Sequence, residues 1–194
     1  IILISLLIAS IAFTTFLGIK KSVEETTDAE VTDVDAIPIK ATDTLKIKML
    51  GNLKYDEPLR SGSDDIKYNN DDEKVLFSRD IKISILPSQE EQPQLAVVKQ
   101  SEGFSMDLAR ENATSINYDY RFENKQLALN GYFIGAAANK NNDQQIELNL
   151  YLPEGQLVEL ADNVSGFYYR SKLDAINVKD SLYGHTLQLK EKTL

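Results

Sequence analysis

The sequence has no cysteine and no tryptophan, and its only histidine is His185. Without cysteine, the chain cannot have a disulfide framework, a cysteine-ligated metal site or a cysteine nucleophile. A single histidine excludes a histidine-rich metal site and argues against a serine–histidine–aspartate triad. Because Gly184 precedes it and Thr186 follows it, we interpret His185 as a residue of a turn or a strand end.

Glycine and positive charge are also scarce. The nine glycines are too scattered for a phosphate-binding loop or a nucleophile elbow. Thirty acidic side chains outnumber 21 basic ones, giving 194 residues a formal net charge of -9. Such a surface repels nucleic-acid phosphates and anionic lipid, so we expect no nucleic-acid partner. The hydrophobic share of 42% is typical of a globular protein, and the length indicates one domain with an appendage.

The first 19 residues contain no charged side chain. As a helix they would span roughly 28 Å, close to the ~30 Å hydrocarbon core of a bilayer. Unpaired backbone groups in lipid cost several kcal/mol, so a helix is the form expected there. We predict a transmembrane helix over residues 1–21, the end of a longer membrane region, which contacts the lipid bilayer through residues 1–19. The alternatives are a signal peptide, which normally begins with a basic region, and a buried core helix, which normally has polar positions on one side.

An acidic segment follows the pair Lys20 and Lys21. It has little apolar surface to offset the entropy of ordering it. We predict a solvated linker over residues 22–36, and a cation-binding segment is the alternative. Its carboxylates are Glu24, Glu25, Asp28, Glu30, Asp33 and Asp35.

From residue 37 onward, apolar and polar side chains alternate with a period of two. Alternation places the apolar side chains of a strand on one face, against a core. The segments with this pattern are 45–49, 81–85, 146–152 and 187–189, and further strand candidates are 75–77, 95–98, 116–122, 127–133 and 157–160. We therefore predict a mainly β domain over residues 37–194, built as stacked sheets, a sandwich or a β-helix-like arrangement. No strict repeat at a fixed period is present.

One segment departs from this pattern. In residues 105–116, Leu108, Ala109, Asn112, Ala113 and Ile116 recur at helical spacing. We predict one short helix lying against the β core, with Arg110 and Glu111 facing water.

Acidic clusters are the only candidates for catalysis or metal binding. A glycosidase needs two carboxyl groups in a cleft, and Asp64-Asp65 and Asp71-Asp72-Glu73 qualify by abundance alone. The same loops, with residues 139–143 (NKNND), lack the complete calcium-loop pattern. We interpret them as solvated loops and assign no catalytic, cofactor-binding or metal-binding residue.

Tyrosines offer a candidate binding face. Tyr118 and Tyr120 alternate on one predicted strand, and Tyr168 and Tyr169 are adjacent. Exposed tyrosines favour binding, but half-buried tyrosines at core margins are the commoner case. Asn112 and Asn163 begin two N-glycosylation acceptor patterns, which matter only in a secreted eukaryotic protein.

Four segments resemble a known family when taken in order behind a membrane helix. They are Phe16–Lys21 (FLGIKK), Leu108–Tyr120 (LARENATSINYDY), Leu127–Phe133 (LALNGYF) and Ile146–Leu160 (IELNLYLPEGQLVEL). The chain resembles the C-terminal part of Bacteroidetes-type phage-shock protein C (PspC) proteins, in which a membrane region precedes a ToastRack β domain. The resemblance implies a bacterial envelope-stress protein whose PspC domain lies upstream, and it brings no catalytic residues.

These observations lead to a non-catalytic interaction or sensory domain, tethered to the bacterial inner membrane, with a membrane or envelope protein as partner. A glycan-acting envelope enzyme and a purely structural envelope module are the alternatives. The resemblance implies that the soluble domain is periplasmic, whereas Lys20 and Lys21 alone favour the cytoplasmic side. The sequence does not indicate an oligomeric state.

Overall fold

The computed structural model describes residues 26–40, 42–52, 54–55, 57–171 and 186–188. These residues form a mainly β domain with one short α-helix, α2 (Met106–Thr114), as predicted. Two 3₁₀ segments, η1 (Ala137–Asn139) and η2 (Asp162–Phe167), complete the helical elements of this part of the chain.

The strands form three sheets. Sheet A has the order β1 (Thr27–Ala36), β6 (Gln94–Gly103), β10 (Gln145–Pro153), β5 (Ile81–Ser88) and β12 (Tyr168–Ser171). Sheet B has the order β13 (Thr186–Gln188), β11 (Leu157–Leu160), β2 (Thr44–Leu50), β8 (Gln126–Asn130) and β7 (Tyr120–Glu123). Sheet C comprises β3 (Gly62–Tyr68), β4 (Lys74–Arg79) and β9 (Phe133–Ala136).

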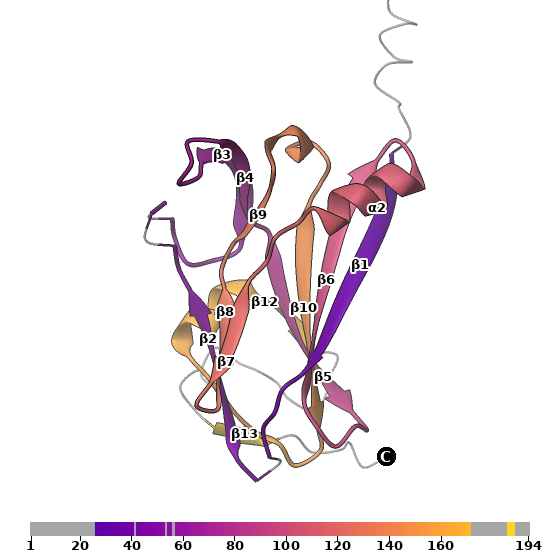
Figure 1. The fold of residues 1–194 in the computed structure, drawn as a ribbon. Coiled ribbons are helices and arrows are strands. Elements are labelled where there is room, and N and C mark those ends of the chain that lie inside the picture. Colours follow the sequence, from indigo (N-terminus) through magenta and orange to yellow (C-terminus); the bar gives the residue numbers. More distant parts are fainter. Residues whose placement is uncertain (1–25, 41, 53, 56, 172–185, 189–194) are drawn as a thin grey trace, which may run out of the picture.

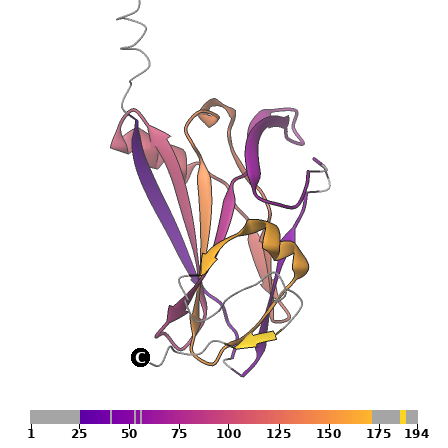
Figure 2. The same cartoon turned by 180° about the vertical axis from the view of Figure 1, so that it is seen from behind.

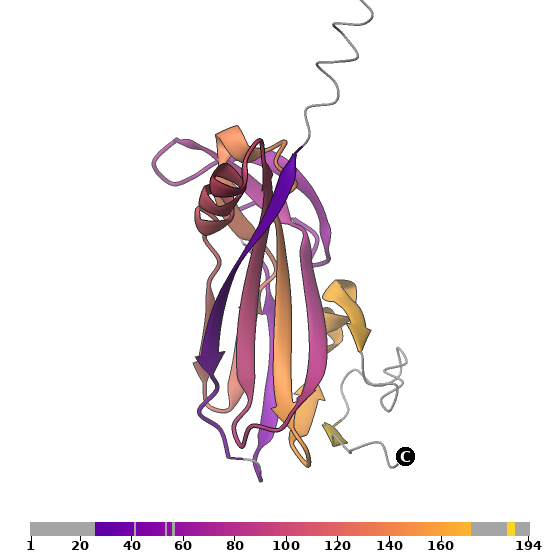
Figure 3. The ribbon, with the colours of Figure 1, turned by 90° about the vertical axis from the view of Figure 1, so that its right-hand side faces the viewer.

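Sheets A and B face each other and enclose the core (Figures 1 and 3). In β10 every second side chain, from Ile146 to Leu152, is buried, and β2 shows the same alternation. The predicted period of two is therefore confirmed where it is clearest in the sequence. One hydrophobic cluster joins both sheets, and its fully buried members include Leu45, Ile81, Leu127, Ile146, Leu148 and Leu160.

The chain winds between the sheets in an irregular β-helical manner. It passes from sheet B to sheet A three times, from β2 to β5, from β8 to β10 and from β11 to β12. Equivalent strands pair in parallel, β2 with β8 and β11, and β5 with β10 and β12. Figure 2 shows the last crossing, made by η2. Because the connections differ in length, the winding leaves no fixed repeat in the sequence.

Two predicted strands are shorter in the structure. The candidate 116–122 becomes a strand only at Tyr120, and the candidate 127–133 divides into β8 and β9. The division falls at Gly131, whose N–H donates to the carbonyl of Leu50. A Cβ at Gly131 would lie 2.7 Å from Leu59 and 2.9 Å from Phe167, so glycine permits the close crossing there.

The predicted linker over residues 22–36 is wrong for residues 27–36, which form strand β1. This strand pairs with β6 in an unbroken antiparallel register from Thr27↔Gly103 to Ala36↔Gln94. β1 is an edge strand, and most of its side chains stay exposed, so it needs little apolar surface of its own. Its β-branched residues favour an extended backbone, and its carboxylates are typical of a protected sheet edge.

Helix α2 lies against the ends of β6 and β1 (Figures 1 and 3). The Ser105 side chain accepts a hydrogen bond from the Leu108 N–H (3.2 Å) and caps the first turn. Ala109, Asn112 and Ala113 are buried, and Arg110 and Glu111 face water as predicted. Leu108, expected on the buried face, is instead exposed.

No helix in the described part of the chain is long and apolar enough to cross a bilayer. The predicted membrane helix over residues 1–21 lies outside the described residues, as does His185.

Candidate functional site

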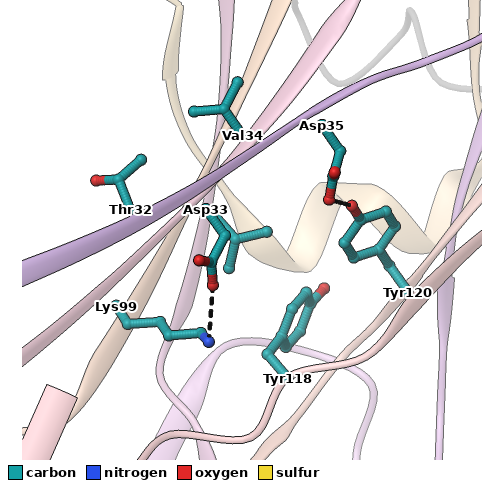
Figure 4. A pocket seen from close by; sticks show the side chains of 8 residues that line it. Thr32, Asp33, Val34, Asp35, Lys99, Tyr118 and Tyr120 are labelled. Carbon is teal, nitrogen blue, oxygen red and sulfur yellow. Dashed lines mark hydrogen bonds and ion pairs between the residues drawn. The ribbon is translucent and has the colours of Figure 1, made fainter. Parts of the chain in front are cut away.

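A cavity of about 490 Å³ opens at one edge of the sandwich, between β1 and the segment that leads into β7 (Figure 4). β1 and β7 are the edge strands of sheets A and B, and within the described part of the chain no further strand pairs with either of them on this side. Small-molecule sites measure about 300–1,000 Å³, and the volume falls in that range. The lining residues are Thr32, Asp33, Val34, Asp35, Val97, Lys99, Tyr118 and Tyr120.

Tyr118 and Tyr120 reach the cavity from the same face because they are two residues apart on extended backbone. The Tyr118 hydroxyl donates to the carbonyl of Asn130 (2.9 Å). The Tyr120 hydroxyl donates to the Asp35 carboxylate and so links the two sheets across the opening (Figure 4). The predicted tyrosine face is therefore part of a cavity, and both hydroxyls keep lone pairs that can accept hydrogen bonds.

The charged groups of the cavity come from β1 and β6. The Lys99 ammonium lies 2.9 Å from the Asp33 carboxylate, with 16% of the lysine side chain and 57% of the aspartate side chain exposed. Asp35 supplies a second carboxylate on the same strand. The site thus offers two carboxylates, one ammonium and two phenols around an apolar floor at Val97, which suits binding of a polar ligand or a peptide segment.

Burial raises the pKa of the Tyr118 hydroxyl well above its usual value. The pKa of Tyr120 is also raised, first by desolvation and then by its hydrogen bond to Asp35 and the negative charge there. Both phenols therefore stay protonated where exposed tyrosines ionise.

We expect this to appear in the stability at alkaline pH. The unfolded chain releases the Tyr120 proton near pH 10, whereas the folded chain holds it, so the free energy of unfolding falls as pH rises above about 10. Tyr120→Phe removes this contribution and should lose less stability between about pH 8 and about pH 11 in urea titrations followed by circular dichroism. Asp35→Asn should also reduce the loss of stability at alkaline pH, because it removes the negative charge that raises the pKa of Tyr120. If both variants lost as much stability as the parent between these two pH values, the raised pKa of Tyr120 would be contradicted.

The acidic clusters predicted from the sequence differ in their exposure to solvent. Asp71, Asp72 and Glu73 form an exposed loop, whose backbone N–H groups at Asp71 and Glu73 donate to the Asn69 side chain. Asp64 is half-buried, and desolvation raises its pKa; the same holds for Asp80, which the sequence analysis missed. Neither residue lines the tyrosine cavity between β1 and β7, nor a smaller cavity beside Tyr55 and Tyr132.

Metal binding receives no support from these loops. Among the described residues, no group of three or more His, Asp or Glu side chains could hold a metal ion. Residues 139–143 are tied to their surroundings instead: the Asn139 amide donates to the Ser115 hydroxyl, and the Asn142 carbonyl accepts from the Glu102 N–H.

Both glycosylation patterns have structural roles. The side-chain amide of Asn112 is buried and donates to the carbonyl of Glu102 (2.9 Å). The Asn163 amide donates to the Met49 carbonyl (2.9 Å) and accepts from the Met49 N–H (3.1 Å), continuing the pairing of β11 with β2. Since each amide nitrogen is already a donor within the fold, neither is presented for modification.

A second aromatic group was missed by the sequence analysis. Phe77 packs between Tyr55 (centroids 4.8 Å apart, edge-on) and Tyr132 (5.3 Å, stacked). Tyr55 and Tyr132 line a smaller cavity of about 210 Å³ with Asn52, Lys54, Asn69, Asn70 and Ile134. No spacing in the sequence connects these rings. Tyr168 and Tyr169, by contrast, belong to β12.

Comparison with known proteins identifies one family. A model described as "ToastRack found in some PspC" matches residues 67–194. Strands β1 and β2 precede the matched region yet pair with β6 and β8 within it, so the folded unit extends further toward the N-terminus.

No curated protein matches the sequence. Among solved structures, a putative cell adhesion protein from Clostridium sporogenes is similar at 11% identity, over 70% of this chain and 47% of that one. The chain thus spans about half the length of that protein. The TM-score of 0.25 is too low to support an argument about fold or function.

Proposed function

This chain belongs to the ToastRack family found in some PspC proteins, and from that premise we propose that it is a membrane-tethered interaction or sensory domain of an envelope stress-response protein. The membership itself indicates a non-catalytic, envelope-related β domain. The proposal adds a binding role, an inner-membrane anchor in residues 1–19 and a periplasmic location for the β domain, with a membrane or envelope protein as partner.

The tyrosine-lined cavity is the observation that carries the binding role. The hydroxyls of Tyr118 and Tyr120 and the ammonium of Lys99 each have a partner within the fold. These contacts hold the groups in fixed positions, so a partner meets an ordered arrangement of phenols and charges. Val34 at its rim is 56% exposed, an apolar side chain that a partner could cover. A rigid cavity on a tethered platform can bind a partner segment without chemistry, and binding would shift the state of the attached protein.

The glycan-acting enzyme is supported only by the half-buried carboxylates of Asp64 and Asp80. An acid–base pair needs a cleft that admits a sugar between the two groups, and the two cavities described above are lined by other residues. We therefore favour binding over catalysis.

Charge reversal in the cavity tests the proposal. Asp33→Lys places two ammonium groups together, and we expect it to abolish stress-induced signalling in the native host while the protein remains folded and inserted. The Asp33 side chain is 57% exposed at the edge of the sheet, so a lysine there can extend into water, and loss of the Asp33–Lys99 pair should cost about 1–2 kcal/mol. Asp28→Lys is the matched control, an exposed residue of the same strand outside the cavity.

A photo-crosslinking residue at Val34 provides the direct readout. We expect a discrete adduct with one envelope protein that disappears in Asp33→Lys and persists in Asp28→Lys. If Asp33→Lys and Asp28→Lys gave the same signalling and the same crosslinked adduct, the cavity would not be the interaction site. Protease added to spheroplasts should digest the β domain if it is periplasmic, and full protection would place it in the cytoplasm.

A further inference from the structure

We propose that the end of the domain formed by the β6–α2 turn is a membrane-contact face, whose side chains Phe104, Met106 and Leu108 enter the interfacial layer of the bilayer. The three side chains are exposed by 66%, 48% and 38%. They lie within five consecutive residues, with Phe104 in the turn before α2 and Met106 and Leu108 in the first turn of the helix, so all three are at the same end of the domain. The inference rests on the proposed anchoring through residues 1–19.

The place of this group in the fold connects it to the anchor. Strand β1 begins at Thr27, which pairs with Gly103, the residue directly before Phe104. Figures 1 and 3 show the start of β1 beside α2 at the same end of the sandwich. Between the uncharged stretch and Thr27 lie only the seven residues 20–26, which extend over at most about 25 Å. An anchored chain therefore holds this end close to the bilayer surface.

Helix α2 leaves two apolar side chains of its first turn outside its packing against the sheet. Its buried side chains, Ala109 and Ala113, face β6 and β1, so Met106 and Leu108 are left outside this packing. The neighbouring charged groups are mainly acidic, including Asp28, Asp107 and Glu111. Attraction to anionic lipid cannot drive the contact, so burial of apolar side chains must do so, and zwitterionic lipid should suffice.

The opposite end of the sandwich supplies an internal reference. Strand β6 runs from Gln94 to Gly103, so its two ends are roughly 30 Å apart. Glu90 lies in the exposed turn before β6, at the end far from α2. A side chain at position 90 should remain in water when the β6–α2 turn touches lipid.

Because the sequence has no tryptophan, a single introduced tryptophan reports one position without background. The full chain is reconstituted in phosphatidylcholine vesicles with or without bromine in the acyl chains, which quenches nearby tryptophan. We expect Phe104→Trp and Met106→Trp to lose at least about half of their emission, as side chains 5–10 Å into the interface would. Glu90→Trp should lose almost none. Phe13→Trp, within the uncharged stretch, reports insertion of the anchor.

The outcomes separate the two proposals. If Phe13→Trp is quenched while Phe104→Trp and Met106→Trp are not, the contact face is wrong and the anchor stands. If Phe13→Trp is not quenched, the anchor fails and the inference fails with it. Equal quenching of Glu90→Trp and Phe104→Trp would also overturn the contact face. The contact face would also be wrong if the tryptophan emission of Phe104→Trp shifted to the blue with protein concentration and did not respond to bromine. That result would indicate that a second copy of the chain covers this residue.

Discussion

Truncation of Leu148 to alanine is expected to lower the free energy of unfolding by about 2–5 kcal/mol. Leu148 is fully buried on β10, the strand that pairs with both β6 and β5 at the middle of sheet A. Its register partners, Val97 and Ile83, are buried on either side, so the backbone cannot close over the lost volume. Urea unfolding followed by circular dichroism measures the change.

Leu148→Met is the matched control for this experiment. It keeps most of the volume and should cost less than about 1.5 kcal/mol. Asn149→Ala, one residue along on the other face of β10, should likewise have a small effect. If Leu148→Ala unfolded at the same urea concentration as the parent, the facing sheets would not enclose the core described here.

Substitution of Gly103 should separate α2 from the sheet. A Cβ at this position would lie 2.5 Å from the backbone nitrogen of Ala109 and 2.9 Å from its Cα. Because both atoms are backbone, no side-chain rotation relieves the clash, and the helix must move. We expect Gly103→Ala to cost about 1–3 kcal/mol and Gly103→Val to cost more. Hydrogen exchange of the α2 amides, which should become faster, locates the effect.

Gly51→Ala is the comparison for Gly103→Ala. A Cβ at Gly51 would meet only the Leu59 side chain, at an ordinary contact distance of 3.9 Å. Stability and α2 exchange should therefore stay near parental values. Slow exchange of the α2 amides in Gly103→Val would show that the helix does not press on the end of β6.

Much of the fold follows from local patterns in the sequence. The alternation in β10 and β2 predicts their buried faces, because half-buried strands must segregate apolar side chains. The helix was also predictable, since Ala109 and Ala113 recur at its period. Strand β1 was not, because an edge strand gains its order from the backbone of β6, and the paired residues are 58 to 76 positions apart in the sequence, from Ala36↔Gln94 to Thr27↔Gly103. Its own side chains remain largely in water.

The candidate site likewise has one feature that a local pattern predicts and others that depend on distant residues. The spacing of Tyr118 and Tyr120 indicated a shared face from the sequence alone. Their partners could not be identified, because Asp35 lies 85 residues from Tyr120 in a segment whose composition is typical of a spacer. The half-buried state of Asp64 and Asp80 was equally hidden, since their neighbours come from distant parts of the sequence, Ser78 and Asp143 beside Asp64 and Gln145 beside Asp80.

The pairing of β2 has a consequence for the order of events during synthesis. Its partners β8 and β11 emerge from the ribosome about 80 and 110 residues later, at Gln126 and Leu157. The backbone C=O and N–H groups of β2 therefore lack their strand partners until most of the chain is made. Strand β1 waits in the same way until β6 has been synthesised. Domains dominated by such distant pairings collapse slowly and expose unpaired edges meanwhile. Until its closing strands arrive, the nascent polypeptide therefore exposes two unpaired strands, β1 and β2, to any other chain that can pair with them.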